Sequence, residues 1–412
     1  MIEARGIAKH TAARLVGATL LVSVLSVAAQ ADDKTIRIGV MNDMSGPYAD
    51  FQGPGSVLAA QMAVEDFGGK AAGRKVEVIS ADHQNKTDVG AAIARKWIDQ
   101  DGVDMIADLP NSAVALAVNQ IVKDKNKVLI ASGAGTAELT GAQCTPNTVA
   151  WTYDTWELGH ALGHAIVGQG KKKWFFITAD YAFGHDLQKQ ASAAVTQSGG
   201  TVLGSVDAPL GTADFSSFLL QAQGSKADVL ALANAGADLT NAVKQSNEFG
   251  IKGQMALAGF VLTVQNIPAL TLNAAQGLLT VNSWYWDQSD GTRKFAHRYA
   301  ERFAKHDMPN DMQAGMYSSV LAYLRAVDKL GSAADGKAVV AAMKATPSND
   351  SVYGNVTIRE DGRAMHPVYL LQVKKPDASK GVGDYFSVVA TIPAEQAFRP
   401  IADGHCPLVA AK

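Results

Sequence analysis

Two successive runs of alternating strand and helix patterns constrain the fold of this chain more than any other feature of its sequence. In the first run, short apolar segments with strand character recur at 35–41, 75–82, 104–108 and 127–132. The second run has them at 172–180, 201–209, 228–234 and 255–260. Helical segments separate the strands, the first of them at 54–67. Such alternation is typical of parallel sheets, so we predict an α/β fold built from two doubly wound units of similar length.

The pattern changes near residue 283. Two predicted helices, at 292–305 and 311–331, follow one another with no strand between them, and further strands are predicted at 366–375 and 385–394. In doubly wound sheets the ligand binds outside the carboxyl ends of the strands. We therefore expect the residues of a binding site in the loops that follow the strands.

The N-terminus has the pattern of an export signal. A positively charged start precedes an apolar run at 15–29, and Ala-Gln-Ala at 29–31 fits a cleavage site with small residues. We predict a signal peptide at 1–31, cleaved after Ala31, and a periplasmic mature protein. An uncleaved membrane anchor is the alternative, but the run is short beside the about 20 apolar residues that span a bilayer.

Charge and cysteine content narrow the possible partners. Without residues 1–31 the chain keeps 34 of its 37 Lys and Arg and 38 of its 39 Asp and Glu, a net charge of −4. This slightly acidic balance argues against nucleic acid or anionic lipid as the main partner. In an oxidising compartment the two cysteines, Cys144 and Cys406, are expected to form one disulfide, with two separate thiols as the alternative.

The motif search supports no catalysis, so we predict neither an enzyme nor a cofactor. No Gly-x-Ser-x-Gly nucleophile motif occurs. The segment GSAADGKA has the spacing of a phosphate-binding loop, but Ala338 lacks the hydroxyl that would hold Mg²⁺. In GAGTAE, Glu138 replaces the third glycine of a dinucleotide-binding turn. His160 and His164 share a helix face, but no third metal ligand is identifiable, and we interpret them as ordinary helix residues rather than a metal site.

Four segments carry a resemblance to a known family. They are MSGPYADFQG after the first strand, ASGAGTAELT at 131–140, DYAFG at 180–184 and ADFSSFL at 213–219. Together with the export signal and the two α/β units, they resemble the leucine/isoleucine/valine-binding protein family of periplasmic solute-binding proteins of ABC importers. The similarity extends over essentially the whole mature chain.

The resemblance implies an architecture and a function. The fold would be the type I periplasmic binding fold, with a three-crossover hinge joining lobe 1 (33–154 and 284–360) to lobe 2 (155–283 and 361–405). A small ligand would bind between the lobes of a monomer, and the membrane permease of an ABC importer would recognise the closed form.

The resemblance also places a carboxylate-binding region on lobe 1. In the family, hydroxyls and backbone N–H groups hold the ligand carboxylate after the third strand and in the T-x-x-E-L region. The corresponding positions here are Asn111, Ser112, Gly133, Ala134, Gly135 and Thr136. Asn111 or Ser112 would equally serve as an ordinary helix cap, because a cap and an anion site use the same helix N-terminus.

An acidic residue that relatives use to bind an α-ammonium group is missing from the expected position. By the resemblance, Gly259 stands there, and no Asp or Glu occurs between Glu248 and Asp287. A buried ammonium group without a counter-charge is costly by several kcal/mol. Asp238, on a neighbouring loop, is a possible substitute.

The remaining candidate positions suit an apolar or aromatic ligand: Phe51, Phe183, Asn234, Ala235 and Phe260. We therefore predict a small carboxylate, and in particular an aromatic acid, such as the lignin-derived acids that some members of the family bind. A branched-chain or other amino acid is the alternative ligand. A ligand sensor built on the same fold is a further alternative function.

The segment NSWYWD, 282–287, places three large rings side by side. We predict that it ends a strand from about Gly277, so that alternation puts Trp284 and Trp286 on one face and Tyr285 on the other. Trp284 is the ring that we expect at the ligand cleft, with packing in the hinge or core as the alternative.

Overall fold

The structure is a computed structural model that describes residues 35–409. The predicted signal peptide and its cleavage after Ala31 lie outside these residues. In the described part of the chain, no helix is long and apolar enough to cross a membrane.

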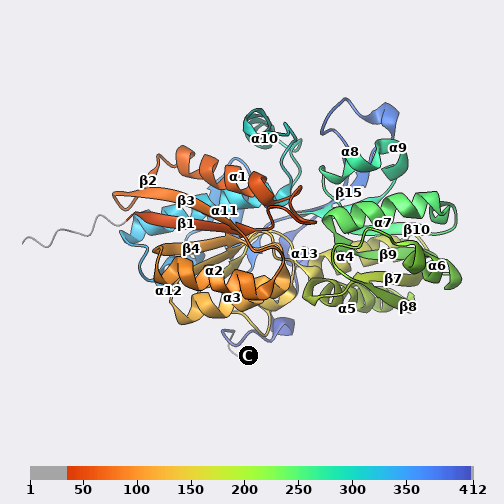
Figure 1. Ribbon diagram of the computed structural model, residues 1–412, viewed down its shortest axis with the longest axis horizontal. Coiled ribbons are helices and arrows are strands. Elements are labelled where there is room, and N and C mark those ends of the chain that lie inside the picture. The colour runs from red at the N-terminus through yellow and green to blue at the C-terminus, as the bar shows by residue number, and fades with distance from the viewer. Residues whose placement is uncertain (1–34, 410–412) are drawn as a thin grey trace, which may run out of the picture. The chain divides into compact units, whose positions relative to one another are not determined.

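The first sheet has six strands in the order β2-β3-β1-β4-β5-β6 (Figure 1). Five of them are parallel: β1 (Ile36–Asn42), β3 (Arg74–Asp82), β4 (Val103–Asp108), β5 (Val128–Ala131) and β6 (Thr148–Ala150). The short β2 (Lys70–Ala71) pairs antiparallel with β3 at the edge. The connecting elements are α1 (Gly53–Asp66), α2 (Thr87–Asp99), α3 (Ser112–Asp124) and η1 (Ala137–Thr140). β1 is buried along nearly its whole length, as expected for a parallel strand with both faces covered.

The second sheet has seven strands in the order β16-β15-β11-β10-β9-β7-β8. Its parallel strands are β7 (Lys173–Ala179), β8 (Thr201–Ala208), β9 (Val229–Ala235), β10 (Ala256–Val261) and β11 (Leu279–Asn282). β15 (Val368–Val373) and β16 (Phe386–Ile392) complete it in antiparallel sense. The helices of this sheet are α4 (Thr155–Gly168), α5 (Ala182–Gln197), α6 (Ser216–Gly224), α7 (Gly236–Glu248), α8 (Asn266–Leu270) and α9 (Leu272–Ala275), with η2 (Ile251–Gly253) before β10.

The chain passes between the two sheets three times. From β6 it enters α4, which packs against α5, β10 and β11. After β11 it returns to α10 (Asp290–Arg302), α11 (Asp311–Leu330) and α12 (Gly336–Ala345), which pack against α1, β4 and β5. A small antiparallel sheet of β12 (Ser348–Asp350), β13 (Gly354–Ile358) and β14 (Ala364–Met365) precedes the third passage, into β15. The fold is therefore two doubly wound α/β lobes joined by three crossovers, which confirms the predicted fold class.

The C-terminal segment returns from the second sheet to the first. After η3 (Pro376–Ala378) and β16 come α13 (Ala394–Ala397) and η4 (Ile401–Gly404). Cys406 then forms a disulfide with Cys144, with the two Cα atoms 5.6 Å apart. The Arg399 guanidinium donates to the Ala137 carbonyl at 2.9 Å, which adds a polar contact to the same junction.

The expectation that NSWYWD forms the end of a strand from about Gly277 is wrong for its three rings, because β11 spans Leu279–Asn282 and ends before them. The indole N–H of Trp284 donates to the Val352 carbonyl at 2.8 Å, and its ring meets that of Phe295 edge to face. Trp284 is buried, at 3% exposure. It therefore packs in the core beside α10.

The other two rings of this segment pack elsewhere. The Tyr285 hydroxyl and the Trp286 indole N–H both donate to the Gly383 carbonyl, at 3.3 and 2.8 Å. Tyr285 and Trp286 thus lie on the same side, against the loop before β16, and do not alternate as strand residues would.

Candidate functional site

Loops from both sheets meet at the carboxyl ends of their strands. The backbone N–H of Ala237, in the first turn of α7, donates to the Pro47 carbonyl at 3.0 Å. Tyr48 and Tyr181 join hydroxyl to hydroxyl across the same boundary. The loop after β1 therefore touches the loops after β7 and β9, at the place where doubly wound sheets bind ligands.

Aromatic rings from both sheets line this junction. Tyr48 and Phe51, from the loop after β1, meet edge to face with ring centres 5.3 Å apart. Tyr181 and Phe183, at the start of α5, have ring centres 6.1 Å apart. Phe51 and Phe183 were predicted site residues. Tyr48 and Tyr181 were missed, although both stand inside the segments that carry the family resemblance.

Two glycines allow the loops to approach one another. A Cβ on Gly135 would lie 2.7 Å from the Phe183 ring and 2.8 Å from the ring of Tyr153. Gly236 has a φ of +60°, and a Cβ there would lie 2.2 Å from the Pro47 carbonyl oxygen. Both positions therefore require glycine, and Tyr153 is a third ring that the sequence reasoning missed.

The loop after β5 offers hydrogen-bond donors beside these rings. Within residues 35–409, the N–H groups of Ala134, Gly135 and Thr136 have no acceptor in the protein, although the loop is buried. The Ser112 hydroxyl, at the exit of the neighbouring β4, is also buried and lacks a partner among these residues. Buried donors are normally paired. Successive N–H groups of this kind suit an anion such as a carboxylate.

Other groups of the predicted carboxylate clamp are already engaged within the protein. Asn111 is the N-cap of α3, and its side-chain oxygen accepts two backbone N–H groups of the first turn, at 3.0 and 3.2 Å. The N–H of Gly133 donates to a carbonyl of β4 at 3.1 Å. The Thr136 hydroxyl donates to Asp186 of α5 at 3.1 Å. These groups shape the loop, and the donors left for a ligand are the three N–H groups and the Ser112 hydroxyl.

The predicted residues of the second sheet divide into two groups. Ala235, which precedes α7, and Phe260 in β10 belong to the same hydrophobic cluster as Phe51 and Phe183. Asn234 is buried at the end of β9, and neither atom of its amide has a partner in the described part of the chain. Ala235 adjoins Gly236 and therefore lies at the ring-lined junction, whereas Phe260 and Asn234 are placed as buried residues of β10 and β9.

Two predicted residues are not brought to the rings. A Cβ on Gly259 would point toward Leu239 of α7, at 3.6 Å. Trp284 belongs to a different hydrophobic cluster, with Phe295 and Tyr299 of α10. Sequence position alone did not distinguish these two residues from the others.

Buried acidic groups form a feature that the sequence reasoning underestimated. Burial raises the pKa of Asp108, Asp238 and Asp311 to about 6 in each case. Burial also raises the pKa of Glu157 well above its usual range, and neither of its oxygens has a partner among the described residues. A carboxylate among these groups would attract an ammonium group. The glycine at position 259 therefore does not by itself exclude an amino-acid ligand.

Of these buried acids, Asp238 is the closest in sequence to the ring-lined junction, two residues after Gly236. It is 3% exposed, and one of its oxygens accepts the N–H of Gly211 at 2.9 Å. Burial raises the pKa of Tyr48 well above its usual range, with contributions from Tyr181 and then from Asp238. Asp238 is therefore close enough to act on the groups around the junction.

Potential metal ligands lie at other places. His160 contacts the backbone carbonyl of Trp156 at 2.9 Å, and His164 contacts the Ser198 hydroxyl at 2.5 Å, so one nitrogen of each ring has a partner within the protein. In the described residues, one exposed group brings three ligand atoms within 4.8 Å of one another: Asp180, His185 and Asp207. No other feature at this group indicates a bound cation.

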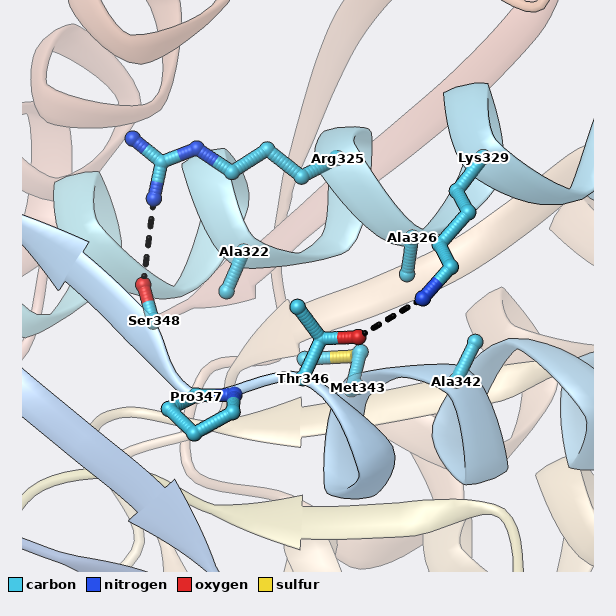
Figure 2. Close-up of a pocket in the computed structure, with 9 residues that line it drawn as sticks. All are labelled: Ala322, Arg325, Ala326, Lys329, Ala342, Met343, Thr346, Pro347 and Ser348. Atoms are coloured by element: carbon cyan, nitrogen blue, oxygen red, sulfur yellow. Dashed lines mark hydrogen bonds between the residues drawn. The ribbon is translucent and has the colours of Figure 1, made fainter.

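A small cavity lies between α11 and α12 (Figure 2). Its volume is about 40 Å³, and the side chains of Arg325 and Lys329 extend beside it to Ser348 and Thr346 at 3.3 and 3.1 Å. A cavity that holds a benzene ring measures roughly 150 Å³. This cavity is therefore too small for an aromatic ring and is not the candidate ligand site.

Comparison with known proteins adds a family match and similar structures. The family described as periplasmic binding protein matches residues 35–381. A periplasmic binding protein from Burkholderia mallei is 48% identical with a TM-score of 0.88, and the match covers 91% of this chain and 99% of that one. A branched-chain amino acid ABC transporter periplasmic ligand-binding protein from Burkholderia xenovorans is 40% identical with a TM-score of 0.80, over 90% and 99% of the two chains. A solute-binding protein of an ABC transporter from Rhodopseudomonas palustris, in complex with 3,4-dihydroxybenzoic acid, is 25% identical with a TM-score of 0.77, over 88% and 98%.

Proposed function

Because this chain belongs to the periplasmic binding protein family, as a substrate-binding protein of an ABC transporter, we propose that its ligand is a small aromatic carboxylic acid. The proteins of this family bind substrates and are not enzymes. The chain would capture the acid in the periplasm, as a monomer, and deliver it to the permease. The proposal concerns the chemistry of the ligand, which membership of the family leaves open.

The observation that carries the proposal is the pairing of unused N–H donors with aromatic walls. The N–H groups of 134–136 have no acceptor within residues 35–409, and Gly135 lies against the rings of Phe183 and Tyr153. A carboxylate would satisfy the donors, while a ring would pack against aromatic side chains that present apolar faces. The relative from Rhodopseudomonas palustris that was solved with 3,4-dihydroxybenzoic acid supports the same chemistry.

The ligand would bind between lobes with the boundaries expected from the sequence. Lobe 1 would comprise 33–154 and 284–360, and lobe 2 would comprise 155–283 and 361–405. The packing of α10 and α11 on α1 supports the change of lobe near residue 284. The contacts of Tyr48 with Tyr181 and of Pro47 with Ala237 would then hold the lobes in a closed arrangement.

A branched-chain or other amino acid is the second candidate, and Asp238 is the observation in its favour. Its buried carboxylate has no cationic partner among the described residues, and it lies near Tyr48. An α-ammonium group placed there would receive a counter-charge. Benzoate and leucine therefore separate the two candidates, because only leucine carries the ammonium group.

The Asp238→Asn variant tests this choice. Because the pKa of Asp238 is about 6 in the fold, against 3.8 for an ordinary Asp, its ionisation lowers the stability of the fold as the pH rises from about 4 to about 6, and the loss stays constant above that. The variant should therefore gain about 1–3 kcal/mol of unfolding free energy at pH 8 and nothing at pH 4, measured by denaturant titration of the ligand-free protein. An equal gain at both values of pH would contradict this assignment.

The same variant should bind benzoate at least as tightly as the parent protein. If the ligand is instead an amino acid, Asp238→Asn should weaken leucine binding by about 10-fold or more, because a buried ammonium group loses its counter-charge. Calorimetric titration of the parent and of Asp238→Asn, each with benzoate and with leucine, distinguishes these results. Loss of benzoate binding in the variant would contradict the aromatic-acid proposal.

A further inference from the structure

We propose that Asp186 is a latch between the lobes, whose carboxylate holds them closed over the bound ligand. This inference rests on the proposed function, because it assumes that ligand binding and lobe closure occur together. It assigns Asp186 the role of a positioning residue: the side chain touches the loop that holds the ligand, and not the ligand itself.

One carboxylate oxygen of Asp186 accepts hydrogen bonds from three donor groups. Its Oδ2 accepts the Thr136 hydroxyl at 3.1 Å, the Ala137 N–H at 3.0 Å and the Thr155 hydroxyl at 2.6 Å. Thr136 and Ala137 follow β5 of the first sheet, whereas Asp186 lies on α5 of the second and Thr155 begins α4. The carboxylate therefore bridges the two sheets beside the first crossover.

The second oxygen anchors the side chain on its own helix. Oδ1 accepts the amide of Gln190, one turn further along α5, at 3.1 Å. This contact turns Oδ2 toward the first sheet. The carboxylate then satisfies buried donors, since Thr136, Ala137 and Thr155 are exposed by 3% or less. Separation of the sheets at this point would break the contacts of Asp186 with Thr136 and Ala137 and leave the carboxylate with Thr155 and Gln190 alone, and hydrogen bonds to a charged group are the stronger ones.

Asp186 and its hydrogen-bond donors lie next to the loop after β5 that would hold the ligand. Thr136 directly follows Gly135, and the N–H of Thr155 donates to the Gly135 carbonyl at 2.7 Å. On α5, Asp186 lies three residues after Phe183 and thus on the same face of the helix. Closure of Phe183 over a ligand at Gly135 would therefore bring Asp186 to Thr136 and Ala137, its two donors from the first sheet, in the same movement.

This arrangement also changes the expected role of Thr136. The family resemblance assigned its hydroxyl to the ligand carboxylate, but here the hydroxyl donates to Asp186. If Thr136 acts through the latch, Thr136→Val weakens ligand binding only while Asp186 is present. If it binds the ligand directly, its effect is independent of Asp186.

A double-mutant cycle on ligand affinity tests the proposal. We expect Asp186→Ala to weaken binding of the aromatic acid by about 10- to 100-fold, chiefly through faster dissociation. Thr136→Val should weaken binding less, and the double variant should bind as weakly as Asp186→Ala alone. Affinities within twofold of the parent for Asp186→Ala, or fully additive effects, would overturn the proposal.

Two further variants control for folding and for loss of charge. Asp186→Asn keeps the shape of the side chain and one acceptor oxygen, so it should lie between the parent and Asp186→Ala in affinity. Asp180→Asn removes an exposed carboxylate from the same segment, where it pairs with His185, and should leave the affinity unchanged. Equal losses in Asp180→Asn and Asp186→Asn would indicate a general charge effect and count against the latch.

Small-angle scattering separates failure of the latch from failure of the proposed function. If the parent protein binds leucine and no aromatic acid, the proposed function fails, and the latch is judged on the three proteins at the same subsaturating concentration of leucine. The latch then requires a larger radius of gyration for Asp186→Ala than for the parent and for Asp180→Asn. The same radius in all three proteins would overturn it.

Discussion

Replacing Cys144 and Cys406 together by serine is expected to lower the unfolding free energy by about 2–5 kcal/mol. The disulfide joins residues 262 positions apart, so its removal lets the unfolded chain explore many more conformations. It also fastens the C-terminal segment to the first sheet after that segment has left β16 of the second. Both cysteines are buried, and serine hydroxyls would replace them without the covalent bond.

Guanidinium titration of the oxidised parent and the double serine variant measures this loss. A reducing agent should lower the stability of the parent to that of the variant and leave the variant unchanged. The contact of Arg399 with Ala137 persists in both proteins, so the segment is expected to stay docked in the native state. Equal midpoints for the oxidised parent and the variant would show that the disulfide contributes nothing to stability.

Trp284→Ala is expected to lower the unfolding free energy by about 3–5 kcal/mol, because it empties a large volume in the core. The ring is 3% exposed, its N–H donates to the Val352 carbonyl, and it meets the Phe295 ring edge to face. The variant also leaves that carbonyl without its donor. Because Trp284 packs away from the ring-lined junction, the affinity for the ligand should stay within about twofold of the parent at temperatures where the variant is folded. A tenfold loss of affinity would correspond to about 1.4 kcal/mol.

Trp156→Ala is the matched control for this substitution. Trp156 stacks on His160 near the surface of α4 and is only partly buried, so its removal should cost clearly less stability. Chemical denaturation gives the stability of both variants, and calorimetric titration gives their affinity. A large loss of affinity in Trp284→Ala with little loss of stability would place this ring in the ligand site, as the alternation of NSWYWD had suggested.

The error over NSWYWD has a physical cause. Period-two alternation holds only while the backbone stays paired in a ladder, and the pairing of β11 with β15 ends at Asn282. Beyond that residue, carbonyls of Val352 and Gly383 determine where the three rings point. No local pattern identifies partners so distant in the sequence. The strands of the two α/β units were predictable because continuous apolar runs bounded by helices need no knowledge of distant partners.

The loops that form the candidate site follow from the sequence, whereas the contacts among their residues do not. The position of Asn111 as a helix cap follows from local sequence and is confirmed. By contrast, the engagement of the Thr136 hydroxyl by Asp186 depends on how the two sheets face one another. Tyr153 comes to Gly135 because β5 and β6, which precede them, pair within the first sheet. Contacts of both kinds leave no periodic signal in the chain.

Among the buried acidic groups the sequence indicates only Asp238, because the family resemblance places the expected acid at Gly259. Asp108, Asp238 and Asp311 come from three separate elements, and burial gives each a pKa of about 6. The burial that raises these pKa values exists only after folding. The absence of an acid at position 259 is therefore a weaker argument against an amino-acid ligand than the sequence alone suggested. The proposal of an aromatic acid rests more on the N–H groups of 134–136 and the aromatic rings beside them.

Calorimetric titration of the mature protein with benzoate, benzamide and leucine tests the central claim most directly. Benzoate combines the ring with the carboxylate that would satisfy the N–H groups of 134–136, so it should bind with one ligand per chain. Benzamide keeps the ring but lacks the charge, and leucine lacks the ring, so both should bind at least about 10-fold more weakly. Tight binding of leucine with no heat from benzoate would contradict the proposed ligand chemistry and identify the protein as an amino-acid receptor.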